Sequence, residues 1–184
     1  MAAPGDWHPE RYRDLLSMLA RQIQLDPRLR RRFDSSDIVQ ETLLKATQNL
    51  DQFRGGTEGE LVKWLQQILQ HALADAIREA HAQKRDVAQE SSLGAVVSDS
   101  SDRLQKWLVA PNSSPSQRAE REEQLLRLAA ALARLPEDQR DVVLLRDSLG
   151  SPVRAIAEHL GRTEKAVAGL LLRGRRKLRE ILQQ

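Results

Sequence analysis

The sequence predicts an all-α fold made of two small helical domains joined by a flexible linker, and three observations support this. Aromatic residues make up only 3% of the chain, and its apolar residues are mostly Leu, Ala, Val and Ile. Apolar positions recur at helical spacing, and the few Gly and Pro residues lie between the periodic segments. Residues 87–116 lose this periodicity and are rich in Ser. We therefore expect an N-terminal domain over residues 1–86, a linker over 87–116 and a C-terminal domain over 117–184.

Three helices are expected in the N-terminal domain. The first runs from about Pro9 to Leu25, where Asp26-Pro27 ends it. The second begins near Ser36 or Asp37, because both are good N-cap residues. Its expected buried stripe consists of Ile38, Val39, Thr42, Leu43, Ala46 and Leu50.

The third helix has the clearest start signal of the chain. Thr57-Glu58-Gly59-Glu60 fits a capping box, in which the Thr hydroxyl and the Glu carboxylate accept hydrogen bonds from backbone N–H groups. The apolar spacing continues to about Ala82. Trp64 repeats with Leu61 and Ile68, so we place it in the core. Stacking on a nucleic-acid base is its alternative role.

The C-terminal domain begins at a second capping box, Ser114-Pro115-Ser116-Gln117, and a further helix begins at Pro136. Ser151-Pro152 then starts a short helix that ends at Gly161, and Thr163 caps the next one. The residues expected to face inward are Ile156 and Leu160 on the first of these helices and Val167, Leu170 and Leu171 on the second. Two helices around a Gly turn, followed by a basic segment, are typical of a helix-turn-helix, so DNA is the expected target.

Charge is unevenly distributed along the chain, whose net charge is +3. From Arg146 to the C-terminus there are nine Lys and Arg against four Asp and Glu, which is typical of a nucleic-acid footprint. A solvated charged surface is the alternative interpretation. Four residues at the start of the last helix lie where base edges are usually met: Thr163, Glu164, Lys165 and Ala168. The basic run that follows is expected to hold phosphates: Arg173, Arg175, Arg176 and Lys177.

Several function classes find no support in the sequence. The chain has no cysteine, which excludes disulfides and thiolate metal sites. Its four histidines form no metal-binding pair, and no Gly-rich phosphate loop follows a strand. We therefore expect no enzyme, no metal or other cofactor and no small-molecule substrate. The sequence has neither an apolar signal-peptide core nor a stretch of roughly 18 apolar residues, so we expect a cytoplasmic protein without membrane insertion.

Several segments carry a resemblance to one known family. Leu135 to Leu178 resembles the C-terminal domain of extracytoplasmic-function (ECF) sigma factors, which are small bacterial transcription initiation factors. Asp37-Ile38-Val39-Gln40-Glu41-Thr42 resembles the polymerase-binding helix of that family. Shorter motifs follow in the family's order: Phe53-Arg54-Gly55-Gly56, then Trp64-Leu65-Gln66-Gln67-Ile68, then Asp75 with Arg78. The combination of these motifs across a linker is much more specific than the helix-turn-helix alone.

The resemblance implies binding to core RNA polymerase, through its beta-prime and beta subunits, and to promoter DNA. In the family the polymerase-binding helix docks on a coiled coil of the beta-prime subunit, which assigns this role to Asp37, Gln40, Glu41 and Leu44. Helix capping is the alternative role of Asp37. The third helix would hold the minus-ten element, with a flipped base in a pocket. Its polar candidates are Gln67, Gln70, His71, Arg78, His81, Lys84 and Arg85. The helix-turn-helix would read the minus-thirty-five element, and an anti-sigma factor is a further partner to test.

This chain departs from the family pattern in the helix-turn-helix. Ala155 stands where many members carry Glu, and Ala168, Gly169 and Leu170 stand where many carry Lys, Ser and Arg. Polar contacts to the minus-thirty-five element are thereby lost. We therefore expect Lys165, Arg173 and Arg176 to contribute more of the DNA binding. Gly169 also costs about 1 kcal/mol of helix propensity relative to Ala, so a close approach of another backbone is expected to be its reason.

Two other functions fit parts of the sequence. A standalone helix-turn-helix regulator would bind a specific duplex as a dimer without polymerase. A sigma-like adaptor would keep the fold for protein interaction and would have lost DNA reading, as the loss of polar residues at Ala168, Gly169 and Leu170 allows.

Overall fold

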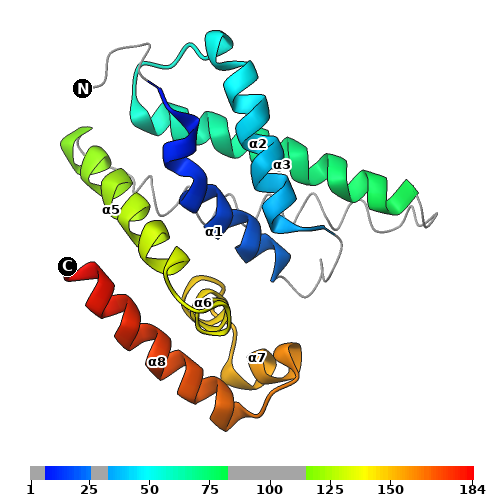
Figure 1. Cartoon of the computed structure of the whole chain (residues 1–184), viewed down its shortest axis with the longest axis vertical. Helices are drawn as coiled ribbons and strands as arrows, with labels where there is room; N and C mark the ends of the chain where they lie inside the picture. The colour runs from blue at the N-terminus through cyan, green and yellow to red at the C-terminus, as the bar shows by residue number, and fades with distance from the viewer. Residues whose placement is uncertain (1–6, 26–32, 83–114) are drawn as a thin grey trace. The chain divides into compact units, whose positions relative to one another are not determined.

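The computed structural model describes residues 7–25, 33–82 and 115–184; most of these described residues are helical, and none of them forms a strand. The predicted all-α class is therefore confirmed. The chain divides into two compact units, residues 1–126 and 127–184 (Figure 1). Helix α5 (Pro115–Ala133) crosses the boundary between them. The predicted linker lies outside the described residues except for Pro115 and Ser116, which open α5, so the predicted domain boundaries stay a prediction.

The N-terminal unit is built around three helices that pack against one another. A 3-10 turn η1 (Pro9–Tyr12) leads into α1 (Arg13–Gln24). Helix α2 (Ser35–Gln48) is followed by a second 3-10 turn, η3 (Leu50–Gln52), and by α3 (Glu58–Ala82). The largest fully buried side chains of this unit come from η1, α1 and α3: Tyr12, Leu15, Leu16, Leu61, Leu65 and Leu73.

The start of α2 differs from the prediction, whereas the start of α3 agrees with it. Asp34 caps α2, because its carboxylate accepts a 2.7 Å hydrogen bond from the Ser36 N–H. The expected caps Ser36 and Asp37 are thus wrong by two to three residues, since Asp34 supplies the same acceptor earlier. The capping box of α3 is confirmed. The Glu60 N–H donates to the Thr57 hydroxyl at 3.3 Å, and Glu60 Oε2 accepts from the Thr57 N–H at 3.1 Å.

The C-terminal unit contains the predicted helix-turn-helix. Helix α6 (Glu137–Val143) continues into a π-helical turn, η5 (Leu144–Ser148), and α7 (Val153–Leu160) and α8 (Glu164–Leu182) follow. Helix α8 packs against both α6 and α7. Gly161 ends α7 at φ +64°, and the Thr163 hydroxyl accepts from the Ala166 N–H at 3.2 Å. Both residues play the roles that the sequence predicts.

Two details of the helix-turn-helix differ from expectation. Ser151 does not cap α7 with its side chain: Pro152 is the N-cap, and no side chain accepts a hydrogen bond there. The Ser151 backbone is used instead, since its N–H donates to the Leu145 carbonyl at 2.9 Å. Leu160 is half-buried rather than buried, because it lies in the last turn of α7, whereas Ile156 is fully buried.

Of the two glycines in α8, Gly174 is the one at which this helix closely approaches α6. A Cβ atom at Gly174 would lie 3.0 Å from Val143 Cγ2 and 3.2 Å from the Gln139 carbonyl oxygen. At Gly169 a Cβ would meet only the flexible end of Arg173, at 3.3 Å. The close approach expected at Gly169 is therefore found at Gly174, one and a half turns further along.

Candidate nucleic-acid interface

One face of α2 presents the residues expected to bind polymerase. Asp37, Gln40 and Leu44 are exposed, and Glu41 is half-exposed. Their spacing of three and four residues places them on the same side of the helix. Leu44 is 58% exposed, so this face offers an apolar side chain amid polar ones. It is suited to a protein partner with basic groups around an apolar contact.

A hollow of about 480 Å³ lies beside this face, between the end of α2, η3 and the middle of α3. One wall of the hollow is formed by residues of α3. They follow one another at steps of three and four positions and so form one stripe of the helix: Trp64, Ile68, His71, Asp75 and Arg78. The opposite wall comes from the end of α2 and from η3: Lys45, Asn49 and Gln52.

A chain of ion pairs crosses the hollow from α2 to α3. Lys45 Nζ lies 2.6 Å from Glu41 Oε1 and 3.5 Å from Asp75 Oδ2, and Arg78 Nη2 lies 2.6 Å from Asp75 Oδ1. The hydrogen bond to Glu41, with a further contribution from Asp75, raises the pKa of Lys45. Two cations and two carboxylates therefore alternate here, and the rim of the hollow is close to neutral.

One aromatic side chain, Trp64, lines the hollow, and it belongs to a cluster of three aromatic rings. The Trp64 ring lies 5.3 Å from the Phe53 ring, and Phe53 meets Trp7 edge-on at 5.9 Å. Trp64 is half-buried and lines the hollow, so the prediction that it belongs to the core is wrong. Its ring packs against Phe53 on one side and lines the hollow on another, which leaves part of the ring uncovered.

The residues predicted for the minus-ten element divide into three groups. His71 and Arg78 line the hollow. Gln67 is exposed and Gln70 is half-buried, and neither lines it. The side chain of His81 and the whole of Lys84 and Arg85 lie outside the described residues.

The wall formed by α2 and η3 was missed from the sequence. Lys45, Asn49 and Gln52 belong to a helix end and a turn, and only the turn at Phe53-Arg54-Gly55-Gly56 brings them opposite α3. A signal was nevertheless present, because the stripe from Trp64 to Arg78 mixes aromatic, polar and charged residues at core-like spacing. The polar members are ordinary on a solvated face, so Trp64 and Ile68 are the part of this signal that a solvated face would lack.

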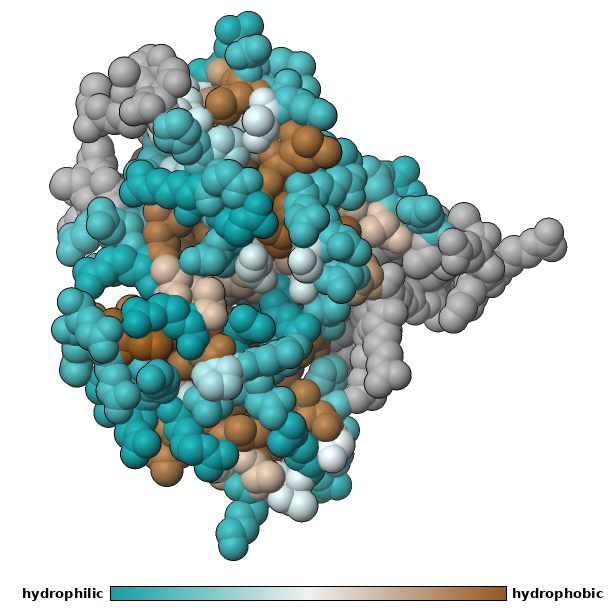
Figure 2. All heavy atoms as spheres, in the orientation of Figure 1, coloured by the Kyte–Doolittle hydropathy of each residue, from teal (hydrophilic) through white to brown (hydrophobic). Residues whose placement is uncertain are grey.

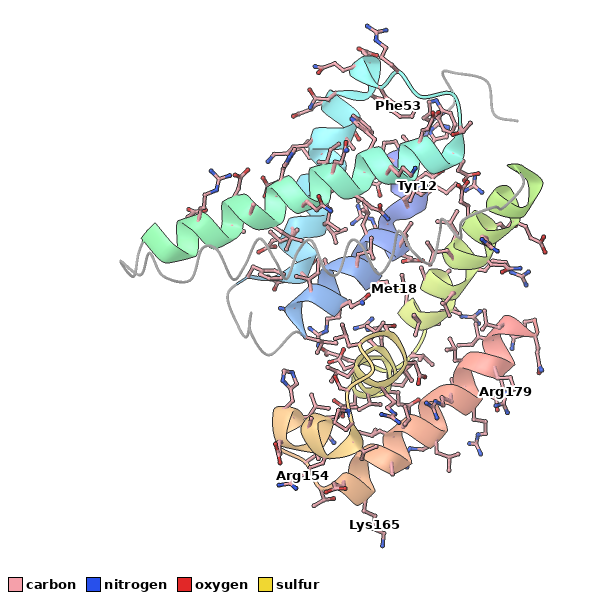
Figure 3. All side chains as sticks on the ribbon, turned by 180° about the vertical axis from the view of Figure 1, so that it is seen from behind. Tyr12, Met18, Phe53, Arg154, Lys165 and Arg179 are labelled. Carbon is pink, nitrogen blue, oxygen red and sulfur yellow. The ribbon has the colours of Figure 1, made fainter. Side chains whose placement is uncertain are left out.

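In the C-terminal unit the candidate residues lie along the exposed side of α8. Thr163, Glu164, Lys165 and Ala168 are all exposed, and Lys165 extends from the first turn of α8 away from the unit (Figure 3). The basic residues expected to hold phosphates are exposed as well: Arg173, Arg175, Arg176 and Lys177. Most of the visible surface of this unit is hydrophilic, with scattered hydrophobic residues (Figure 2).

The arginines of the C-terminal unit differ in the acidic side chains that they already bind. Arg175 binds Asp147 through two hydrogen bonds, one of them 3.1 Å from Nε to Oδ2, and this partner raises its pKa. Arg162 binds Asp138 at 2.6 Å. Arg176 makes only a 3.7 Å contact with Glu180, within its own helix. Arg176 is thus better placed than Arg175 to exchange its contact for a phosphate.

The described residues contain no group of three or more His, Asp or Glu side chains that could hold a metal ion. Among the helices of the described part of the chain, none is both long and apolar enough to span a membrane.

Two family models match this chain, one for each unit. Residues 10–85 match Sigma-70 region 2, and residues 125–178 match region 4 of Sigma-70. The hollow and the α2 face lie in the first match, and the helix-turn-helix lies in the second. The alignment with a solved flagellar Sigma-28/FlgM complex spans 96% of this chain and 94% of the matched chain, at 15% identity. Its TM-score of 0.36 is too low to support a conclusion.

Curated relatives extend the same finding. ECF RNA polymerase sigma factor SigG of Mycobacterium tuberculosis is 31% identical over 160 residues, which cover 80% of this chain and 42% of the relative. ECF RNA polymerase sigma factor EcfG of Rhodopseudomonas palustris is 30% identical over 148 residues, which cover 80% of this chain and 71% of the relative. The chain therefore spans less than half of one relative and more than two thirds of the other. With one family region in each unit and this similarity to EcfG, the chain belongs to the ECF sigma factor family.

Proposed function

We propose that this chain binds core RNA polymerase, directs it to a class of promoters and helps to open the duplex at the minus-ten element. The observation that carries the proposal is the hollow between α2 and α3, whose Lys45 pairs with Glu41 of the α2 face. Family membership supports the same function. In this proposal the polymerase performs the chemistry, and the chain supplies recognition.

The hollow suits one base that has left the stack. The partly uncovered ring of Trp64 offers a stacking surface, which contributes about 1–3 kcal/mol per base. The amides of Asn49 and Gln52 and the His71 ring can hydrogen-bond to base edges. The Asn49 amide already donates to the Lys45 carbonyl at 2.7 Å and accepts from Gln52 at 3.0 Å. These bonds hold Asn49 and Gln52 in position before a base arrives.

The α2 face is the proposed polymerase contact, through the beta-prime and beta subunits. Its exposed Leu44 supplies the apolar contact, and Asp37 and Glu41 supply charge that attracts a basic surface. An anti-sigma factor is a further proposed partner of this face, because its occupation would exclude polymerase.

Helix α8 is the proposed reader of the minus-thirty-five element. Its first turn carries Lys165 and Ala168 toward base edges, and its later turns carry Arg173 and Arg176 toward phosphates. The N-terminal unit would thus act on separated strands, and the C-terminal unit on intact duplex.

The test is transcription in vitro with core polymerase on fragmented genomic DNA, followed by sequencing of the start sites. We expect start sites that share an upstream motif and that require this chain. A second arm uses Leu44→Asp, which should weaken binding to core polymerase about tenfold if this side chain is buried in the complex. Lys63→Ala, an exposed change on α3, is the control and should bind normally. Absence of chain-dependent start sites would contradict the proposal.

The same material separates the two alternatives. A standalone regulator would shift a specific duplex without polymerase, whereas a sigma factor needs the core enzyme. An adaptor would keep its activity after replacement of Arg173 and Arg176 with Ala, whereas a promoter reader would lose it.

A further inference from the structure

The outward stripe of α8 consists of Lys165, Ala168, Leu172, Arg176 and Arg179. These residues follow one another at steps of three and four positions, so they share one side of the helix, and all five are exposed. The buried residues of α8 lie on the opposite side: Val167, Leu170, Leu171, Gly174 and Ile181. The outward stripe therefore points directly away from the core of the C-terminal unit.

Leu172 is the unusual member of the outward stripe. It is 73% exposed, more than the other exposed large apolar residues of the described chain, Leu44 at 58% and Leu182 at 38%. One turn earlier Ala168 is exposed, and Gly169 beside it is half-buried. Within the outward stripe itself, the middle thus carries methyl groups and no side-chain hydrogen-bond donor or acceptor, whereas Lys165, Arg176 and Arg179 carry charge at its two ends. The Arg173 guanidinium lies beside the stripe, next to Gly169.

This pattern fits the major groove of DNA better than it fits a protein surface. A protein interface has an apolar core of many residues over hundreds of square ångströms per partner, and here one Leu and one Ala stand between cations. Phosphates flank the groove on both sides and complement those cations. Within the groove, the C5-methyl group of thymine is the apolar feature of the base edges. It is therefore the part of the duplex that Ala168 and Leu172 can contact favourably.

We propose that Leu172, assisted by Ala168, is a specificity-determining residue that reads thymine methyl groups in the upstream promoter element. The inference rests on the proposed function and deepens it, because it assigns the base feature that α8 recognises. Recognition here comes from apolar contact in the middle of the outward stripe, and affinity comes from phosphate contacts at its ends.

The experiment uses holoenzyme, made from the full chain and core polymerase, and promoters mapped by the transcription assay. Each thymine of the upstream element is replaced in turn by uracil, which removes the methyl group and keeps every hydrogen-bonding atom. At one or two adjacent positions we expect uracil to weaken promoter binding about fourfold, the effect of one buried methyl group. Uracil at the remaining thymines should have little effect.

Variants of the chain test whether the Leu172 side chain causes the loss of binding to uracil-containing promoters. In Leu172→Ala the uracil penalty should disappear, because the contacting isobutyl group is gone, and in Leu172→Met, which keeps the apolar volume, it should remain. Leu182→Ala, at the end of the same helix, is the matched control and should keep the full penalty. Since Leu172 is exposed, neither of its variants should alter the melting temperature.

Three results would overturn the inference while leaving the proposed function intact: uracil tolerated at every position, an unchanged uracil penalty in Leu172→Ala, or weaker binding of Leu172→Ala to core polymerase without DNA. The last of these would show that Leu172 contacts protein. If no start sites depend on the chain, the proposed function itself fails, and that outcome is recognised before any uracil is introduced.

Discussion

The surface proposed for DNA in the N-terminal unit is a hollow of about 480 Å³, whereas in the C-terminal unit it is the exposed side of one helix. In the hollow, Lys45 and Arg78 are paired with Glu41 and Asp75. On α8 the cations Lys165, Arg176 and Arg179 stand on either side of Ala168 and Leu172, and this stripe contains no acidic residue. The two units therefore differ in both shape and charge.

This difference fits the two roles proposed above, one for each unit. A concave, nearly neutral site lined by Trp64 suits a base that has left the duplex, and gains little from phosphates. A convex, basic helix enters a groove and gains most of its affinity from phosphates. The comparison predicts that changes in the hollow affect strand opening, whereas changes on α8 affect binding to duplex.

The largest functional effect is expected from filling the hollow. His71 is exposed and lines it, so His71→Trp should place an indole where the base would lie without unfolding α3. We expect open-complex formation to fall ten- to a hundredfold, since about 1–3 kcal/mol of stacking is lost, with duplex binding upstream unchanged. Permanganate reactivity of unpaired thymines measures the opening. His71→Ala, which leaves the hollow open, should lose much less.

The next effect concerns the framework that holds α8 in place. Gly174→Leu inserts a side chain where even a Cβ lies 3.0 Å from Val143, and should destabilise the C-terminal unit by about 1–3 kcal/mol through overpacking. Gly169→Ala meets only the end of Arg173 and should stabilise the helix by up to about 1 kcal/mol. Thermal unfolding of the full chain measures both. Equal signs for the two variants would contradict the packing described for Gly174.

A smaller effect distinguishes two neighbouring arginines. Arg176→Ala should weaken promoter binding uniformly across sequences and reduce the salt dependence by about one phosphate contact. Arg175→Ala should change the salt dependence less, because Asp147 already engages that guanidinium. Binding of holoenzyme at several salt concentrations measures both slopes. Equal slopes would mean that the pair between Arg175 and Asp147 opens on DNA.

Much of the fold follows from local rules, and so it was predictable. Thr57, Gly161 and Thr163 act where capping and turn chemistry place them, and the buried stripe of α8 follows from its spacing. These features depend on residues within one or two helical turns, which a sequence displays directly.

The parts that were missed depend on contacts between distant segments. Gly174 and Gly169 are equivalent in the sequence, and only the crossing of α8 over α6 decides which of them needs to lack a side chain. Trp64 has the spacing of a core residue, but the turn after α2 leaves its ring partly open. The same turn brings Asn49 and Gln52 opposite His71, which no local pattern indicates.

The smallest expected effect compares how the two units begin their principal helices. Glu60 Oε2 accepts hydrogen bonds from the backbone N–H groups of Gly56 and Thr57, at 2.9 and 3.1 Å, and these bonds lower its pKa. A lowered folded-state pKa means that the stabilisation is complete above the unfolded pKa and is lost as pH falls through the folded one. Helix α8 has Ala166 at the corresponding position, and its cap is the uncharged hydroxyl of Thr163.

Hydrogen exchange followed by NMR can therefore separate the two helix starts. Between about pH 7 and about pH 3, protection of the Gly56 and Thr57 amides should fall as Glu60 gains a proton, whereas protection of the Ala166 amide should change little. Glu60→Gln should remove most of this pH dependence. In that variant the Gly56 and Thr57 amides should already be less protected at neutral pH, because a neutral amide is a weaker acceptor than a carboxylate. If Gly56 and Thr57 lost protection equally in Glu60→Gln, another group would have to titrate there. The capping box would then not explain the acid sensitivity of α3.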